Sequence, residues 1–470
     1  MSTINPIIPG FAPDPSIVRI GDIFFIVTSS FHLFPGLPIY ASKDLISRKQ
    51  IAKKGQQVDF VSSQLGNAIN RRTQLSLRRS NVEIWPIPET ELKIQISGSL
   101  YAPTIRVHNG TVFVVCTNVV QPERTSSAPG SNSTENFVVS TKDIWSDQWS
   151  DPVYFDFYGI DPSIFVDDDG WVYIQGSSMP GAPYTKIHQF EIDLATGTKL
   201  SEEQEIWAGT GGIHPEGPHI YKKDGWYHHL VAEGGTFEGH MMTVARSTEI
   251  WGPYESDPRN LTLMASGDDG YVQHTGHCDM FQDDKGEWWG VCLGVRKDVR
   301  RRWPEGEWPS LDRVELNPKT LPQIISSDLA IAPASPLVEF VYIRDAELDK
   351  YKVLNQGGSI VLETSPIDLS DSFGSPTFIG KRQRQTEEKS EAVMKVPGGS
   401  HAPAATEHIK AGLVCYKDEQ RFFRVCYDTS ETAIFFEVWN NADKIHRTAP
   451  HKLDTAPASL NFRIEYTEKK

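Results

Sequence analysis

The sequence lacks any apolar run long enough to cross a membrane, and residues 1–6 contain no apolar segment of the kind found in signal peptides. We therefore expect a cytoplasmic protein. Basic residues are also scarce: 46 Lys and Arg stand against 61 Asp and Glu, which gives a net charge of −15. This charge argues against nucleic acid and anionic membrane surfaces as partners and favours a neutral substrate. The sequence leaves the oligomeric state open.

Cysteine is rare as well, and the five cysteines are an odd number. Four of them, Cys116, Cys292, Cys415 and Cys426, lie inside strand-like runs. We interpret them as reduced core residues, which excludes a disulfide framework as the basis of the fold.

Aromatic residues and turn formers, in contrast, are plentiful: 12 Trp, 15 Tyr and 22 Phe accompany 36 Gly and 31 Pro. This composition is typical of aromatic-rich strands joined by many turns. A length of 470 residues exceeds what one hydrophobic core usually organises, so we expect two domains.

One pattern occurs five times in the chain. In residues 161–176, β-branched and aromatic residues flank an Asp-Asp-Asp-Gly run, which is typical of two strands joined by a tight turn. The same pattern returns in residues 14–29, 102–117, 216–231 and 277–294. The repeats start roughly 55–90 residues apart, which suits one four-stranded sheet each. The sequence therefore predicts an all-β protein that contains a five-bladed β-propeller.

Three of the five repeats begin with a carboxylate, namely Asp14, Asp161 and Glu216, and a fourth begins with His277. Equivalent strand ends converge at one mouth of a propeller, so these side chains are expected to share a pocket. Three acids in one pocket are costly unless they share protons or bind a positive group. The alternative is that Asp-Pro and Glu-Gly only form turns. The sequence places all three acids at the same phase of the repeat, which favours a functional role.

Residues 5–17, 28–31, 34–40 and 42–45, at the opening of the chain, resemble the corresponding part of glycoside hydrolase family 43, and more narrowly of its two-domain β-xylosidases, especially the fungal ones. The likeness covers roughly three quarters of the chain and is strongest around the three acids. It is carried by residues 5–17, 28–31, 34–40, 42–45 and 100–106, continues to 293–296, and returns more weakly at 342–344 and 378–383.

The resemblance implies a role for each acid. Asp14 matches the general base of the family, Glu216 the general acid, and Asp161 the carboxylate that orients this acid and raises its pKa. The chemistry independently requires such a set. Inverting hydrolysis needs one carboxylate that activates water and one carboxylic acid that protonates the leaving oxygen. A third negative group keeps that acid protonated near neutral pH.

Four further residues match family positions. His277 matches a histidine on the propeller axis, where some members place calcium or water, so axial calcium is the one ion suggested and no cofactor is required. Arg296 matches an arginine that binds the terminal sugar, and Phe31 and Tyr101 match aromatic residues of the first subsite. Each has a simpler alternative: a buried histidine bonded to the backbone, one member of a basic run, and ordinary packing aromatics.

Residues 1–325 are predicted to form the propeller, and residues 335–470, which alternate short apolar runs with turns, a β-sandwich. The chain ends earlier than two-domain family members usually do, so we expect a truncated sandwich. Three segments depart from the family pattern: the polar stretch 48–64, an extra loop at 82–97, and an Arg- and Pro-rich stretch at 297–328 in place of an expected strand.

The expected function is that of an inverting exo-glycosidase that removes terminal pentoses from small oligosaccharides, with β-1,4-linked xylose as the first choice. An α-L-arabinofuranosidase is the nearest alternative, since both sugars present similar hydroxyls to a small pocket. A non-catalytic sugar-binding propeller is the other. The three acids favour an enzyme, because a binding site gains nothing from three buried carboxylates.

Overall fold

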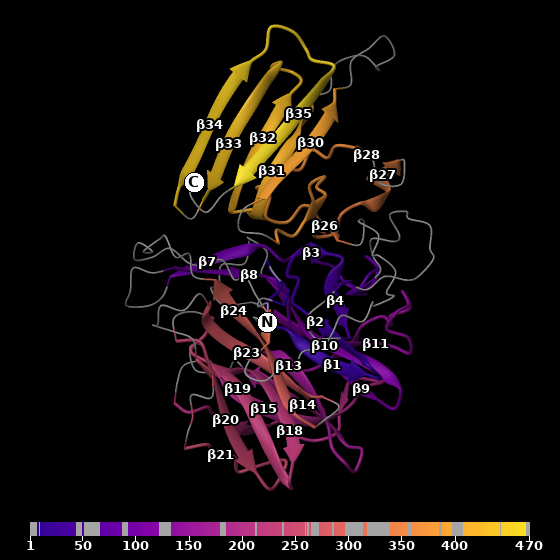
Figure 1. Cartoon of the computed structure of the whole chain (residues 1–470), viewed down its shortest axis with the longest axis vertical. Coiled ribbons are helices and arrows are strands. Elements are labelled where there is room, and N and C mark those ends of the chain that lie inside the picture. Colours follow the sequence, from indigo (N-terminus) through magenta and orange to yellow (C-terminus); the bar gives the residue numbers. More distant parts are fainter. Residues whose placement is uncertain are drawn as a thin grey trace. The chain divides into compact units, whose positions relative to one another are not determined.

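The computed structural model divides into two compact units that alternate along the chain (Figure 1). Unit 1 comprises Met1–Ser80, Gly98–Val361 and Phe378–Arg384, and unit 2 comprises Asn81–Ser97, Leu362–Thr377 and Gln385–Lys470. The structure describes residues 7–8, 10–43, 49–50, 66–86, 93–121, 133–178, 185–211, 214–236, 239–258, 260, 263–264, 272–283, 286–296, 314–316, 339–354, 359–384, 388–396, 408–441 and 443–466.

Five antiparallel sheets of unit 1, here called blades 1 to 5, follow one another along the chain. Together they form the five-bladed β-propeller that the repeats predict. Blade 1 consists of β1 (Ser16–Ile20), β2 (Ile23–Val27), β4 (Gly36–Ser42), β5 (Lys49–Gln50) and β6 (Asn67–Ile69). Blade 2 consists of β9 (Ser99–His108), β10 (Thr111–Val120), β11 (Ser133–Thr141) and β12 (Val153–Phe155). Blade 3 consists of β13 (Gly159–Val166), β14 (Val172–Ser178), β15 (Lys186–Asp193), β16 (Thr198–Lys199) and β17 (Gln204–Trp207).

The last two blades complete the ring. Their strands are, for blade 4, β18 (Glu216–Lys223), β19 (Trp226–Glu233), β20 (Met241–Ser247), β21 (Glu255–Ser256) and β22 (Leu263–Met264), and for blade 5, β23 (Val272–Gln282), β24 (Trp288–Arg296) and β25 (Val314–Leu316). The first strands of neighbouring blades contact one another, so β1, β9, β13, β18 and β23 gather at the centre.

Each predicted repeat is the hairpin formed by the first two strands of a blade. In blades 2 and 4 the connecting turn has two residues, Asn109-Gly110 and Asp224-Gly225, and all four have positive φ angles. This geometry matches the right-handed twist of the flanking strands, and Asn, Asp and Gly adopt it at low cost. Local turn chemistry therefore sets the register of these hairpins.

Five apolar clusters fill the five junctions between neighbouring blades. Phe25 and Val114 belong to the cluster between blades 1 and 2, while Ile17 of blade 1 clusters with Phe281 and Val291 of blade 5. The remaining three clusters join blades 2 and 3, blades 3 and 4, and blades 4 and 5. Burial of apolar surface at every junction, at roughly 25 cal/mol per Å², thus closes the ring between its first and last blades.

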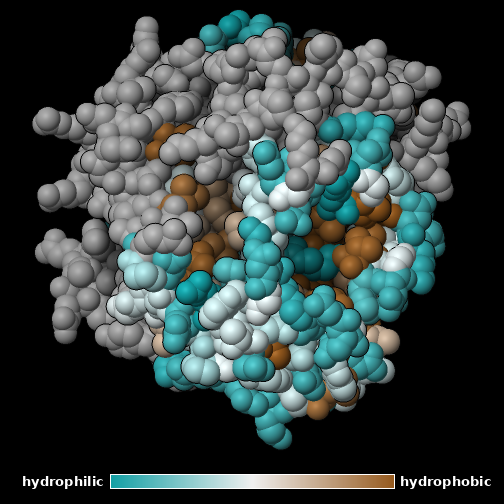
Figure 2. All heavy atoms as spheres, turned by 60° about the horizontal axis from the view of Figure 1, so that its bottom comes forward, coloured by the Kyte–Doolittle hydropathy of each residue, from teal (hydrophilic) through white to brown (hydrophobic). Residues whose placement is uncertain are grey.

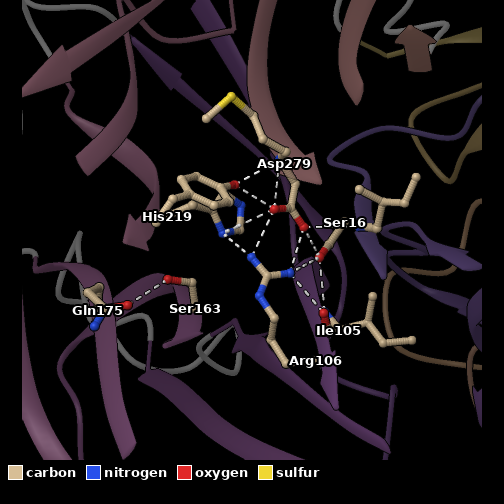
Figure 3. Close-up of polar contacts among 10 residues, drawn as sticks. Ser16, Ile105, Arg106, Ser163, Gln175, His219 and Asp279 are labelled. Carbon is tan, nitrogen blue, oxygen red and sulfur yellow. Dashed lines mark hydrogen bonds and ion pairs between the residues drawn. The ribbon is translucent and has the colours of Figure 1, made fainter. Parts of the chain in front are cut away.

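A polar network connects the inner strands of different blades (Figure 3). The buried Asp279 carboxylate of blade 5 accepts hydrogen bonds from Ser16 Oγ at 2.5 Å and from both terminal nitrogens of Arg106, at 2.7 and 2.8 Å. Tyr221 of blade 4 adds a hydrogen bond of 2.6 Å. Burial alone would raise the pKa of Asp279, but the Arg106 guanidinium and His219 hold it below its usual range. One carboxylate therefore connects blades 1, 2, 4 and 5.

Unit 2 contains a four-stranded sheet and a two-stranded sheet that contact each other, as expected for a β-sandwich. The four-stranded sheet consists of β31 (Lys410–Asp418), β32 (Arg421–Asp428), β33 (Ala433–Asn440) and β34 (Ile445–Lys452), and the pair of β30 (Glu388–Lys395) and β35 (Ser459–Tyr466). The predicted extra loop at 82–97 is instead a hairpin of β7 (Val82–Pro86) and β8 (Lys93–Ser97), which belongs to unit 2.

Part of the chain that follows the expected boundary near residue 335 belongs to the propeller unit. Strand β26 (Phe340–Ile343) pairs with β3 (Leu33–Phe34), which precedes β4 of blade 1, and also with β29 (Gly380–Lys381). The other short elements of this region are β27 (Tyr351–Leu354), β28 (Ser359–Leu362) and the 3₁₀ helix η2 (Leu348–Lys350).

The five cysteines are free thiols, four of them buried and Cys415 half-buried, which confirms the expectation of reduced core residues. Most of the atypical segments 48–64 and 297–328 lies outside the described residues, although β25 from the second segment pairs with β24. The described residues include no helix with the length and apolar character of a membrane span. On the face in Figure 2, hydrophilic side chains dominate the described surface and hydrophobic ones are visible mainly inside recesses.

We expect Asp279→Asn to destabilise the propeller by about 3–5 kcal/mol at pH 7, because it leaves the Arg106 charge buried without its partner. The folded-state pKa of Asp279 is depressed, so its contribution is present above the unfolded pKa of about 3.9 and is lost as pH falls below it. Urea denaturation at pH 7 and pH 3 should show a smaller difference from wild type at pH 3. The control, Asp151→Asn, removes an exposed pair with Arg71 and should cost less than about 1 kcal/mol. Equal effects of the two variants would contradict the prediction.

Candidate active site

The inner strands of blades 2 to 5 all carry a two-residue bulge at the same place. In blade 3, Asp161 and Pro162 lie between the paired residues Ile160 and Ser163 and oppose the single residue Gly176 of β14. The bulges of the other three blades are 102–103, 217–218 and 277–278. A bulge interrupts the ladder and redirects side chains, so these four positions are oriented alike.

The first residue of each bulge has a left-handed backbone conformation, which is uncommon for residues other than glycine. Blade 1 has the same conformation at Asp14, which precedes Pro15 and the start of β1. The φ angles are 52° at Asp14, 40° at Ala102, 55° at Asp161, 56° at Gly217 and 50° at His277. One residue per blade therefore has a left-handed conformation at the centre of the propeller; in the four blades where it is not glycine the backbone is strained, and such strain often accompanies function.

The prediction that all three acids share one phase of the repeat is wrong for Glu216. Gly217 occupies the position of Asp14 and Asp161, and Glu216, paired with Ala232, occupies the position of Ile160. The reason is that the motif of blade 4 is Glu-Gly-Pro, with glycine between the acid and the proline, whereas blades 1 and 3 have Asp-Pro. All three acids still lie at the same end of the inner strands.

His277 lies among these acids. Its Nδ1 is 3.8 Å from Asp14 Oδ1 and 4.0 Å from Asp161 Oδ2, and the Gly217 N–H donates a hydrogen bond of 3.0 Å to the same Asp161 oxygen. A Cβ atom at position 217 would come within 2.9 Å of the His277 ring, so the residue after Glu216 has to be glycine. The structure thus brings Asp14, Asp161, Glu216 and His277 together, as the sequence predicts.

The pKa values of the acids are set by burial and by each other. Burial raises the pKa of Glu216 well above its usual value, and the negative charges of Asp161 and Asp14 raise it further. Burial also raises the pKa of Asp161 to about 6, with His277 opposing and Asp14 adding to the shift. The raised pKa favours the protonated form of Glu216, which is the form that a proton donor needs.

The two aromatic residues predicted for the first subsite contact each other. The Phe31 ring contacts the Tyr101 ring at 4.9 Å between centroids, and the Phe31 N–H donates to the Leu100 carbonyl oxygen at 3.1 Å. Phe11, to which the sequence assigns no role, contacts Phe31 at 5.4 Å. All three rings are partly exposed, as the residues of a sugar subsite would be. Arg296 is the last residue of β24, where its backbone pairs with Val272. Its side chain is not among those that the structure describes.

The resemblance suggests axial calcium near His277, which is one of the residues that the structure describes. Among them, no three His, Cys, Asp or Glu side chains gather closely enough to hold a metal ion. His277 faces two carboxylates across 3.8 and 4.0 Å, and we interpret it as their electrostatic partner. No chemical step below uses calcium, which stays a prediction of the resemblance.

Comparisons with known proteins agree with this geometry. The family model of glycosyl hydrolases family 43 matches residues 3–322. A non-reducing end α-L-arabinofuranosidase of Bacteroides ovatus is 32% identical over 444 residues, which are 89% of this chain and 74% of that relative. A xylosidase/arabinosidase of Butyrivibrio fibrisolvens is 32% identical over 473 residues, covering 92% of this chain and 81% of the relative.

Solved structures show the same likeness. A GH43B protein from a xyloglucan utilisation locus of Bacteroides ovatus has a TM-score of 0.77 at 28% identity, and covers 99% of this chain and 87% of its own. A GH43 protein of Bacillus licheniformis has a TM-score of 0.74 at 26% identity, with 99% and 86% covered. Five blades around a central group of carboxylates define a propeller-type glycoside hydrolase. The chain belongs to glycoside hydrolase family 43, and the resemblance seen in its sequence is confirmed.

We expect Asp161→Asn to lower the pKa of Glu216, because the substitution removes a nearby negative charge and keeps an oxygen that can accept the Gly217 N–H. The basic limb of the pH–rate profile on an aryl glycoside should move to lower pH by about one unit, which corresponds to about 1.4 kcal/mol.

The matched control is Asp167→Asn, which changes a carboxylate of the same blade that is bonded to Lys222 and Tyr227, away from the acids. This control should leave the basic limb in place. An unmoved limb in active Asp161→Asn enzyme would show that Asp161 has no electrostatic role.

Proposed function

We propose that the protein is an inverting exo-glycosidase that releases terminal pentoses, with β-1,4-linked xylose of xylo-oligosaccharides as the preferred residue. The observation that carries the proposal is the contrast between two carboxyl groups at one end of the propeller. Burial and two neighbouring carboxylates raise the pKa of Glu216 well above its usual value, while Asp14 Oδ2 accepts a hydrogen bond from the Ser29 hydroxyl.

In this mechanism Asp14 removes a proton from a water molecule as the water attacks the anomeric carbon. Glu216 gives its proton to the glycosidic oxygen, so the bond to the leaving sugar breaks without forming an alkoxide. Attack from the face opposite the leaving group inverts the configuration. Inversion requires the two carboxyl groups to lie about 6.5–9.5 Å apart, with the water between them. Asp161 acts through its charge and through the Gly217 N–H.

The relatives support a pentose as the released sugar. The Bacteroides relative is named for arabinofuranose, the Butyrivibrio relative for both sugars, and a relative from Vibrio sp., 34% identical over 300 residues, is a xylan 1,3-β-xylosidase. The α-L-arabinofuranosidase is therefore the second candidate. The third, a non-catalytic sugar-binding propeller, does not account for the raised pKa of Glu216.

The proposal is tested with purified protein on paired nitrophenyl β-D-xylopyranoside and α-L-arabinofuranoside and on xylobiose. We expect a higher kcat/KM on the xyloside, and release of xylose from xylobiose. Proton NMR of the first product should show α-xylose, the inverted anomer. A higher kcat/KM on the arabinofuranoside would select the second candidate, and β-xylose as the first product would refute inversion. Sugar binding without hydrolysis would select the third.

Substitution of the two principal acids should separate their roles. Asp14→Ala should reduce kcat by about 10²–10⁴-fold whatever the leaving group, because the attacking water always needs a base. Glu216→Ala should cause a comparable loss with poor leaving groups such as xylose, and a much smaller one with dinitrophenolate, which departs without a proton. Steady-state kinetics on both substrate types measures the difference. Equal losses in Glu216→Ala would exclude it as the general acid.

A further inference from the structure

Ser29 is a buried serine directly after β2, and none of the roles above includes it. Its side chain has no exposed surface, and its N–H donates a hydrogen bond of 3.1 Å to the carbonyl oxygen of Pro13. The backbone of Ser29 is thus tied to the residue that precedes Asp14. This contact places the serine hydroxyl beside the Asp14 carboxylate.

The donor and the acceptor in each of the two hydrogen bonds of this hydroxyl are fixed. The Ala102 N–H donates to Ser29 Oγ at 2.7 Å, and a backbone N–H can only donate. The single hydroxyl proton of Ser29 is therefore free for Asp14 Oδ2, which lies 2.6 Å away. Asp14 Oδ2 is thus the acceptor of the one hydrogen bond that the Ser29 hydroxyl can donate.

The second oxygen of Asp14 is in a different position. Oδ1 is the atom nearest His277, whose Nδ1 lies 3.8 Å away, beyond hydrogen-bonding distance. Among the described residues, the negative charge of Asp14 contributes to the raised pKa values of Asp161, Glu216 and Cys116. Ser29 therefore engages one oxygen of the carboxylate and leaves the other on the side of the remaining site residues.

We propose that Ser29 is the positioning residue of the general base: it holds Asp14 Oδ2 and thereby presents Oδ1 to the attacking water. Ala102 is the left-handed bulge residue of blade 2. The hydrogen bonds from Ala102 to Ser29 and from Ser29 to Asp14 therefore also connect blade 2 to the proposed general base in blade 1. The inference rests on the proposed role of Asp14, and one of its tests is independent of activity.

The kinetic test is Ser29→Ala. The variant should lose about 10²-fold in kcat, while KM should change little. The reason is that without the Ser29 hydrogen bond the Asp14 side chain adopts orientations in which Oδ1 does not contact the attacking water. The loss should be the same for dinitrophenyl and poor leaving groups, unlike that of Glu216→Ala. A wild-type kcat in Ser29→Ala, or a loss confined to KM, would overturn the proposal.

Ser30→Ala is the matched control. Ser30 is the next residue, is equally buried, and its hydroxyl accepts the Leu37 N–H at 3.0 Å. Both variants remove one buried hydroxyl and leave one backbone N–H without its acceptor, so their melting temperatures should fall alike. Only Ser29→Ala removes a hydrogen bond to a carboxylate, so only Ser29→Ala should lower kcat substantially. Equal losses of kcat would show that Ser29 is merely structural.

A crystal structure of Ser29→Ala tests the same inference without an assay. Asp14 should adopt a different side-chain torsion or two conformers, and an unchanged Asp14 would overturn the proposal. If the wild-type enzyme hydrolyses no glycoside, the proposed function fails while this structure still decides what Ser29 holds. Should Ser29→Ala not fold, Ser29→Cys keeps a γ atom but offers a weak donor, and we expect it to lower kcat as well. A wild-type kcat in Ser29→Cys would count against the proposal.

Discussion

The buried ion pair between Asp279 and Arg106 is the interaction on which the rest of the propeller depends. It joins the last blade to the second, and through Ser16 and Tyr221 it reaches the first and the fourth. Breaking such a pair leaves a buried charge without compensation, so the inner strands are held in one arrangement. His277 precedes Asp279 by two residues on the same strand, and Asp14 precedes Ser16 by two. The polar network around Asp279 therefore helps to position His277 and Asp14.

The three acids are chemically the same group, and their surroundings make them different. Asp14 receives a hydroxyl hydrogen bond from Ser29, and Asp161 a backbone N–H from Gly217. Burial and the charges of the other two acids raise the pKa of Glu216. Environments that separate the pKa values of neighbouring carboxylates are what divide acid from base in glycoside hydrolysis.

The chain beyond the fifth blade also supports the site within unit 1. Strand β26 pairs with β3, and the Arg344 N–H donates a hydrogen bond of 2.8 Å to the carbonyl oxygen of His32, the neighbour of Phe31. Arg344 itself is fully buried. A segment that is more than 300 residues away in sequence thus holds the loop that carries Phe31.

The sequence by itself determined the five hairpins, the fold class and the three acids, because turn chemistry and alternating apolar residues act over a few neighbouring positions. Only the tertiary structure decided that Glu216 lies one residue before the position of Asp14 and Asp161, since bulge register depends on pairing with the next strand. It also decided that Ser29 meets Ala102, 73 residues away, and that Arg106 meets Asp279, 173 residues away. Hydrogen bonds over such separations form only when whole blades pack, and no local pattern encodes them.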